Sequence, residues 1–202
     1  MVKTIFIEIP SWLGDAIMAT PAIQNIIKTY PDAKITLLGS YVSTQAFKNY
    51  PNIEKIIVDA MNSPHYRYGY EHAWVCERNG QIAGAFFGYP GEWEPLIDGP
   101  LQASMLKFDC PLELTPKENE TLPGEWYLDT LVTHPNFRRQ GVGREMMDAA
   151  SQIAEEAGYK MIALNCDIDN KAAYQLYKKS GFERKTRLVL STHVYWHMTK
   201  AI

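Results

Sequence analysis

A strand, a polar turn and a helix follow one another between Glu125 and Gly158, and this order constrains the fold more than any other feature. The residues from Glu125 to Thr133 (EWYLDTLVT) are typical of a strand. His134 to Gln140 form a polar turn. Apolar residues then recur at helical spacing, and Gly158 fits a C-terminal cap. Together with the strand signals elsewhere, this order predicts a mixed α/β protein.

The turn leads into a helix start with two glycines and three arginines. Main-chain N–H groups at a helix start lack partners inside the helix, so they form an anion site that the helix dipole strengthens. The glycines let a phosphate approach the backbone, and the arginines add positive charge. A glycine turn before an ordinary helix is the alternative for such a pattern taken alone. The residues concerned are Arg138, Arg139, Gln140, Gly141, Val142, Gly143 and Arg144.

Two stretches resemble the signatures of the GNAT superfamily of N-acetyltransferases. LDTLVTHPNFRRQGVG resembles its acetyl-CoA loop, with Arg138, Gly141 and Gly143 at the fixed positions. About 27 residues later, NKAAYQLYKKSGF resembles the second signature, in which an asparagine opens a helix. The resemblance implies a twisted, mostly antiparallel sheet flanked by helices, and acetyl-CoA as cofactor.

The resemblance also implies roles for individual residues. The main chain of Leu131, Val132 and Thr133 would hydrogen-bond the pantetheine arm beside a V-shaped parting of the sheet. The residues from Arg138 to Arg144 would hold the pyrophosphate, and Asn170 would contact the arm. Tyr177 would protonate the departing thiolate. Without the signature, a packed helix aromatic would be the better interpretation of Tyr177.

Glu125 and Asp129 are the candidate general bases. They lie four residues apart on one face of the expected strand and would act directly or through water. Solvent-exposed carboxylates at a strand end are an equally good interpretation. The resemblance implies direct attack by a small-molecule or peptide amine, and the three cysteines lack a histidine arrangement for a covalent intermediate.

Other side chains were considered for the acceptor pocket. Aromatic surfaces suit cationic amines, although core packing explains most of these rings equally well. Carboxylates in the long loop would attract a cation or be solvated. The candidates are Tyr66, Tyr68, Tyr70, Trp74, Trp93, Trp126 and Tyr127, with Glu92, Glu94 and Asp98.

The first sixty residues follow a different pattern. Strand-like runs at 4–9, 34–38 and 54–58 alternate with helical spacing at 12–30 and 41–50, which predicts a βαβ segment. The run PSWLGDAIMATPA resembles the start of bacterial heptosyltransferases, whose sugar base would match Asp15. Because only about a sixth of such an enzyme is present, sugar transfer is disfavoured.

The chain therefore looks composite, with a partial heptosyltransferase-like segment at 1–60 and a GNAT domain at 61–202. The join falls near residues 58–64. Two arrangements are open: the strand at 4–9 replaces the missing first GNAT strand beside residues 72–77, or it belongs to a separate appendage. A non-catalytic acyl-CoA-binding domain is the rival function, since the acceptor wall differs.

Composition narrows the function classes. The 202 residues carry a net charge of −3, which does not suit a general nucleic-acid binder. No apolar run is long enough for a membrane span, and no signal peptide is expected, so the cytoplasm is the default location. His193 and His197 share a strand face without a third ligand, which favours a surface or core role over a metal site. A homodimer is left open.

Overall fold

The computed structural model describes residues 4–8, 29, 32, 34–38, 58–108, 119–190 and 193–202. The chain divides into two compact units. One comprises Met1–Ala60 with Leu101–Leu112, and the other comprises Met61–Pro100 with Glu113–Ile202. The domain limits expected at 1–60 and 61–202 remain a prediction.

The smaller unit contains a two-stranded parallel sheet. Strand β1 (Thr4–Glu8) pairs with β2 (Lys34–Leu38) in register from Thr4 opposite Lys34 to Glu8 opposite Leu38. Strand β1 therefore does not add to the sheet that contains residues 72–77, and the arrangement in which it replaces the first GNAT strand is wrong. The parallel pairing agrees with the βαβ pattern of the sequence.

Most of the other predictions for residues 1–60 concern residues that lie outside the described ones. That applies to the helix at 41–50, to Asp15 and to most of the helix at 12–30, of which Thr29 is described as helical. Val58 lies in a helical turn and not at the end of the predicted strand at 54–58.

Helix α5 (Gly99–Lys107) contacts Asp59 through two side chains. The Ser104 hydroxyl donates to Asp59 Oδ2 over 2.8 Å, and Lys107 pairs with the same carboxylate.

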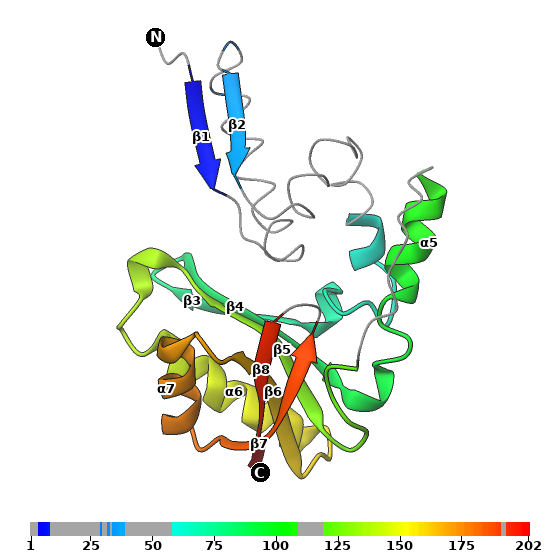
Figure 1. Cartoon of the computed structure of the whole chain (residues 1–202), viewed down its shortest axis with the longest axis vertical. Coiled ribbons are helices and arrows are strands. Elements are labelled where there is room, and N and C mark those ends of the chain that lie inside the picture. Colours follow the sequence, from blue (N-terminus) through cyan, green and yellow to red (C-terminus); the bar gives the residue numbers. More distant parts are fainter. Residues whose placement is uncertain are drawn as a thin grey trace. The chain divides into compact units, whose positions relative to one another are not determined.

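The larger unit is built on a six-stranded sheet with the order β3-β4-β5-β6-β8-β7 (Figure 1). All neighbouring strands are antiparallel except β5 and β6. This mixed α/β architecture confirms the predicted fold class. The strands are β3 (Ala73–Arg78), β4 (Gln81–Pro90), β5 (Trp126–Thr133), β6 (Met161–Asp167), β7 (Glu183–Leu190) and β8 (His193–Ala201).

The hairpin β3–β4 turns at Asn79 and Gly80, a residue pair that favours a two-residue hairpin turn. Both residues have positive φ, 52° and 73°, which is the conformation of a two-residue hairpin turn. Short 3-10 helices precede and follow the hairpin, η1 (Tyr70–His72) and η2 (Gly91–Trp93). The long proline-rich stretch from Pro90 to Gly124 contains η2 and α5.

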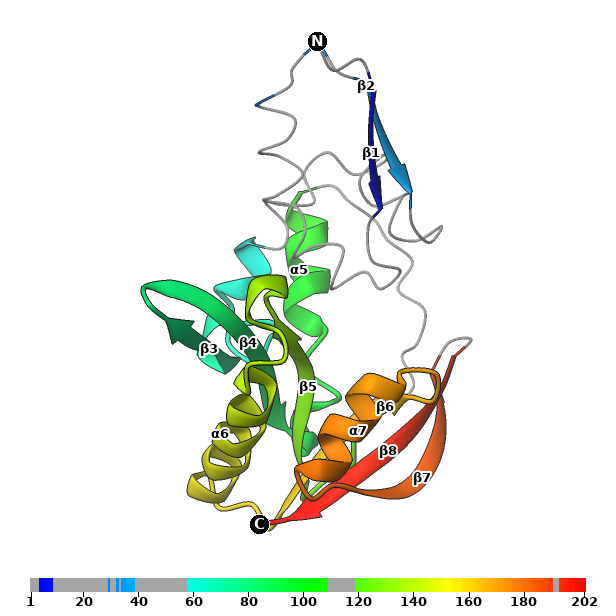
Figure 2. The same ribbon diagram turned by 90° about the vertical axis from the view of Figure 1, so that its left-hand side faces the viewer.

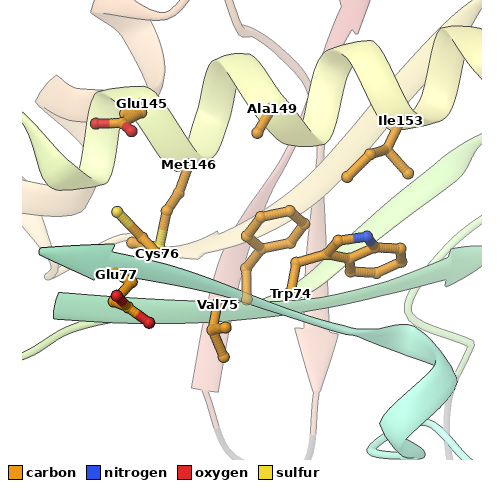
Figure 3. Close-up of a pocket in the computed structure, with 9 residues that line it drawn as sticks. Trp74, Val75, Cys76, Glu77, Glu145, Met146, Ala149 and Ile153 are labelled. Carbon is orange, nitrogen blue, oxygen red and sulfur yellow. The ribbon is translucent and has the colours of Figure 1, made fainter. Parts of the chain in front are cut away.

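Helices α6 (Val142–Glu156) and α7 (Lys171–Lys179) cover one face of the sheet and form the main core with it. Met146 and Met147 of α6 are buried against Trp126 and Leu128 of β5. Near β3, Figure 3 shows Ala149 and Ile153 of α6 facing the strand across a shallow groove. Trp74 stacks on Phe86 there, with ring centroids 5.2 Å apart.

The opposite face of the sheet carries a smaller cluster and a set of buried polar side chains. Tyr89, Ile97, Tyr127 and Ala163 are each at most 2% exposed. Hydrogen-bonded polar residues from β5, β6 and β8 surround this cluster, as buried polar groups require. Within the described residues, no helix is long and apolar enough to cross a membrane.

Candidate functional site

The sheet of the larger unit parts between β5 and β6. These parallel strands pair only at Trp126 with Ile162 and at Tyr127 with Ala163. Beyond those pairs, β5 continues beside β4 as far as Thr133, and β6 continues beside β8 as far as Asp167. Figure 2 shows β5 and β6 running apart. Among the residues that the structure describes, no strand pairs with the edge of β5 that faces β6 along Leu131, Val132 and Thr133, where the parting is predicted. Arg138 Nε lies 3.5 Å from the Thr133 carbonyl.

A bulge marks the start of this parting. The pairing of β4 with β5 shifts between Phe87 and Gly88, because Phe87 lies opposite Thr130 and Gly88 lies opposite Leu128. Asp129 is thus the extra residue of the bulge. A bulge bends its strand and increases the local twist, which directs β5 away from β6.

The turn after β5 has the geometry of an anion-binding site. The short helix η3 (Pro135–Phe137) leads to Arg139 and Gly141, whose φ angles of 62° and 87° are both left-handed. Gly141 is the N-cap of α6, and its carbonyl accepts the N–H of Glu145 over 3.0 Å. The N–H groups of Val142, Gly143 and Arg144 precede the first hydrogen bond of the helix, so they have no partner inside it and can bind an anion.

The side chains of the turn leave positive charge at its surface. Arg138 and Arg139 are exposed, and in the described part of the chain neither pairs with a carboxylate. Arg144 approaches Asp148 at 4.0 Å, and both side chains are more than 60% exposed. Gln140 donates to the carbonyl of Asn136 over 2.7 Å, which fixes the turn.

Gly143 permits helices α6 and α7 to approach each other. A Cβ atom at this position would lie 3.1 Å from Leu176 Cδ2 and 3.7 Å from Thr133 Oγ1. The start of α6, the end of β5 and α7 therefore meet at Gly143. This contact brings the anion-binding turn close to the second signature.

Helix α7 supplies the two residues expected from that signature. Asn170 is its N-cap, and its side-chain oxygen accepts the N–H of Ala173 over 3.1 Å. The amide group keeps two N–H donors for another partner. Tyr177 is partly buried beside Phe182, with ring centroids 6.4 Å apart.

Two groups near α7 stay protonated at neutral pH. Burial raises the pKa of Tyr177, with a smaller contribution from Cys166. Burial also raises the pKa of the Cys166 thiol, to about 11. Tyr177 is therefore available as a proton donor, while a neutral, buried thiol is a poor nucleophile.

Glu125 lies just before β5 and is engaged in hydrogen bonds. Its Oε2 accepts from the Thr121 hydroxyl over 3.1 Å and from the Leu122 N–H over 3.2 Å. His197 Nε2 lies 3.2 Å from the same oxygen. Burial alone would raise the pKa of Glu125, but the hydrogen bond from His197 and the smaller contributions of its other neighbours hold it below the ordinary value.

Asp129 lies in the bulge and faces a buried arginine. Arg67 Nη1 is 3.5 Å from its carboxylate, and both side chains are less than 10% exposed. Arg67 also donates to Glu120 over 3.1 Å and to the Tyr89 hydroxyl over 3.2 Å, and its Nε lies 3.7 Å from Asp98. One guanidinium thus sits among three carboxylates beside the start of the parting.

Sequence reasoning missed Arg67, Glu120 and Asn165. Arg67 is a single cation in a tyrosine-rich stretch, which is the one signal that could have identified it. His197 was expected in a surface or core role, and it is buried with 1% exposure, whereas the His193 side chain is 55% exposed. Among the residues described, no group of three or more metal-binding side chains occurs.

The aromatic and acidic candidates separate in the structure. Trp74 and Trp126 belong to the core beneath α6, which explains them without a ligand. Tyr68 lies beside Arg67, whose guanidinium is 5.8 Å from the ring centroid. Glu92 accepts from the Tyr159 hydroxyl, while Glu94 accepts from the Tyr89 hydroxyl over 3.0 Å.

Comparison with known protein families shows to which family the chain belongs. A model described as "Acetyltransferase (GNAT) family" matches residues 43–182. The chain belongs to the GNAT family. The match starts ahead of the join expected near residues 58–64.

Individual relatives agree with this assignment. The chain is 35% identical to the uncharacterized N-acetyltransferase MJ1207 of Methanocaldococcus jannaschii over 175 residues, which cover 83% of the chain and 66% of that protein. A solved acetyltransferase superposes with a TM-score of 0.70 and 32% identity over 95% of the chain and 97% of its own length. The GNAT fold is therefore shown.

A short part of the chain is similar to a protein of a different family. Over 55 residues, which are 27% of the chain, it is 51% identical to lipooligosaccharide heptosyltransferase 2 of Campylobacter jejuni. The matches to the first curated relatives span only 17% to 28% of those proteins. The chain thus combines a GNAT domain with a short heptosyltransferase-like segment.

The donor of this family is acetyl-CoA, and the residues present fit it. An anion-binding turn suits the pyrophosphate, because its left-handed residues direct N–H groups outward. The unpaired edge of β5 offers main-chain groups to an amide-containing arm. Asn170, at the start of α7, offers a further donor.

Proposed function

We propose that this GNAT domain transfers the acetyl group of acetyl-CoA to an amine by direct attack, without a covalent enzyme intermediate. One observation carries the proposal. The unpaired edge of β5 leads through a left-handed turn into the free N–H groups that open α6. That combination suits a long ligand with a polar arm and a diphosphate.

Binding would involve mainly the backbone. Residues from Arg138 to Arg144 would hold the diphosphate through N–H groups and guanidinium charges. Leu131, Val132 and Thr133 would hydrogen-bond the pantetheine arm, and Asn170 would contact it from α7. Acetyl-CoA supplies the acetyl group as a thioester, whose carbonyl a β5 N–H group would polarise.

Asp129 would act as the general base and accept the proton of the attacking amine, directly or through a water. Asp129 lies in the bulge where the sheet starts to part, and the adjacent Arg67 stabilises its ionised form. Glu125 is less suited to this role, because His197, Thr121 and the Leu122 N–H already occupy its carboxylate. Glu125 is interpreted instead as a structural partner of His197.

The departing sulfur is assigned a proton from Tyr177. A cationic acceptor first loses one proton to solvent and becomes a neutral amine. As the new C–N bond forms and the C–S bond breaks, the amine loses a second proton to Asp129 and the thiolate gains one from the Tyr177 hydroxyl. Burial raises the pKa of Tyr177, so the phenol carries its proton at neutral pH. Solvent then returns Asp129 and Tyr177 to their starting states.

The acceptor would be a small-molecule or peptide amine. Asp98, Glu120 and Asp129 surround Arg67 and give this region an excess of negative charge, which favours a cationic acceptor. No nucleic-acid or membrane partner is proposed. The cytoplasm is the expected location, and the proposal does not depend on whether the chain dimerises.

Release of CoA thiol in the presence of a panel of amines tests this function. We expect amine-dependent thiol release by the wild-type protein, and saturable CoA binding in isothermal titration. CoA binding without turnover on any amine would favour the non-catalytic alternative. Absence of CoA binding would contradict both functions.

A further inference from the structure

The two halves of the parted sheet are joined by little main-chain pairing. Strands β3, β4 and β5 form one half, and β6, β8 and β7 form the other. Two residue pairs connect β5 to β6, whereas β6 and β8 share seven. The width of the parting must therefore depend on other contacts.

Asn165 of β6 forms one such contact. It lies two residues beyond the last pair with β5, on the face opposite α6. Its Nδ2 donates to the Tyr127 hydroxyl of β5 over 3.0 Å and to the carbonyl of Glu120 over 2.8 Å. The side chain thus bridges the two half-sheets where they begin to separate.

His197 of β8 forms the second contact. Its Nε2 lies 3.2 Å from Oε2 and 3.3 Å from Oε1 of Glu125, at the start of β5. Its Nδ1 lies 2.8 Å from Oδ1 of Asn165. The ring, which is 1% exposed, therefore joins the two bridging residues to each other.

The donors and acceptors of this group are mutually consistent. Because Nδ2 of Asn165 faces two oxygen acceptors, Oδ1 must face His197, and Nδ1 of the ring must donate to it. Nε2 of the same ring faces both oxygens of the Glu125 carboxylate. Every atom of the bridge has a complementary partner, so the bridge has a defined length.

We propose that Asn165, with the His197–Glu125 pair behind it, is a brace that sets the width of the parting between β5 and β6. Its members are positioning residues: they hold the unpaired edge of β5 at the spacing that the pantetheine arm needs. This inference rests on the proposed function for its effect on acetyl-CoA. The geometric effect on the parting stands independently of it.

Binding and kinetics test the effect on the donor. Asn165→Ala removes the bridge, and Glu125→Ala leaves the ring without its partner. We expect each to raise the Kd for CoA and the KM for acetyl-CoA about 10-fold, the loss expected for one or two hydrogen bonds, with a smaller change in kcat. Glu125→Gln keeps a hydrogen-bonding partner for a neutral ring and should restore most of the affinity.

His193→Ala is the matched control. His193 lies on the same strand face, four residues before His197, but its side chain is 55% exposed and pairs with Asp167 at 3.5 Å. It should leave Kd and KM unchanged. If folded Asn165→Ala protein binds CoA like the wild type and has its KM, the brace is contradicted.

A distance measurement keeps the two proposals separate. Spin labels at Val132→Cys and Ile168→Cys, whose native side chains are 41% and 42% exposed, flank the parting from β5 and from the end of β6. Cys76→Ser and Cys110→Ser provide the background. We expect a broader distance distribution in Asn165→Ala than in the parent, with or without CoA.

An unchanged distribution would overturn the brace even if Asn165→Ala binds CoA poorly. A broadened distribution in a protein that never binds CoA would instead retain the brace and reject the proposed function. If Asn165→Ala does not fold, Tyr127→Phe replaces it, since that change removes only one hydroxyl of the bridge. The same criteria then apply to Tyr127→Phe.

Discussion

At the scale of single residues, the site depends on which proton each buried group keeps. Tyr177 holds its proton because burial disfavours the phenolate, while Glu125 loses its proton because His197 stabilises the carboxylate. Arg67 balances several carboxylates that would otherwise repel one another. In the proposed mechanism Tyr177 is the acid and Glu125 has a structural role.

Tyr177→Phe tests the acid directly. The substitution removes one hydroxyl and keeps the ring that packs on Phe182, so we expect kcat to fall about 10²-fold while the Kd for CoA changes little. Steady-state thiol release and titration calorimetry give the two values. Tyr174→Phe, on the same helix, is the control and should match the wild type; equal activity of both variants would remove Tyr177 from the mechanism.

The ionisation of Glu125 gives a pH prediction. Its pKa is lowered on folding, so its stabilising contribution is present above about pH 4.3, the unfolded value, and is lost as the pH falls through the folded value. Carbon-13 NMR of the Glu125 carboxyl should therefore show a midpoint below about pH 4.3. A midpoint above that value would mean that burial outweighs the hydrogen bond from His197.

At the scale of the elements, the functional geometry comes from the junction of β5 and α6. The bulge at Asp129 directs the strand away from β6, and Gly141 reverses the chain into the helix. Gly143 lets α7 approach this junction closely. Three local features thus place an unpaired strand edge, an anion site and the second signature side by side.

The substitutions Gly141→Ala and Gly158→Ala distinguish the cost of backbone strain from an effect on CoA binding. Both glycines have left-handed φ angles, 87° and 90°, and no atom lies within 4 Å of a Cβ built at either position. Each substitution should cost about 1–2 kcal/mol in urea unfolding. Only Gly141→Ala should also weaken CoA binding, because Gly158 caps the far end of α6; an equal loss of affinity in both would contradict a specific site at the turn.

Local signals in the sequence predicted these elements well. The Asn79-Gly80 turn, the Gly158 cap and the Asn170 cap each depend on residues close together in the chain, so a short stretch specifies them. The brace could not be predicted, because His197 and Glu125 are 72 positions apart and meet only through the sheet order. The bulge at Asp129 could not be predicted either, because it depends on the register of β5 with β4.

At the scale of the whole molecule, the chain combines a GNAT domain with a segment that resembles a heptosyltransferase. Strand β1 pairs with β2 and not with the six-stranded sheet, and a short segment is 51% identical to a heptosyltransferase. The matched segment spans 17% of that enzyme. The likeness to the heptosyltransferase is therefore a resemblance over a short segment.

Because the match covers only 17% of the heptosyltransferase, we expect that the chain does not use a sugar nucleotide. We expect no saturable heat of binding when ADP-heptose is titrated into protein that binds CoA in a parallel experiment. Asp15→Asn should leave acetyl transfer unchanged. Saturable ADP-heptose binding that Asp15→Asn abolishes would show that the first segment retains a function of its own.

A crystal structure of the chain grown with CoA tests the central claim most directly. The account predicts that the diphosphate contacts the N–H groups of Val142 and Gly143, and that the arm lies along the free edge of β5 from Leu131 to Thr133. A structure in which CoA binds elsewhere, while protein atoms cover both that edge and the start of α6, would contradict it.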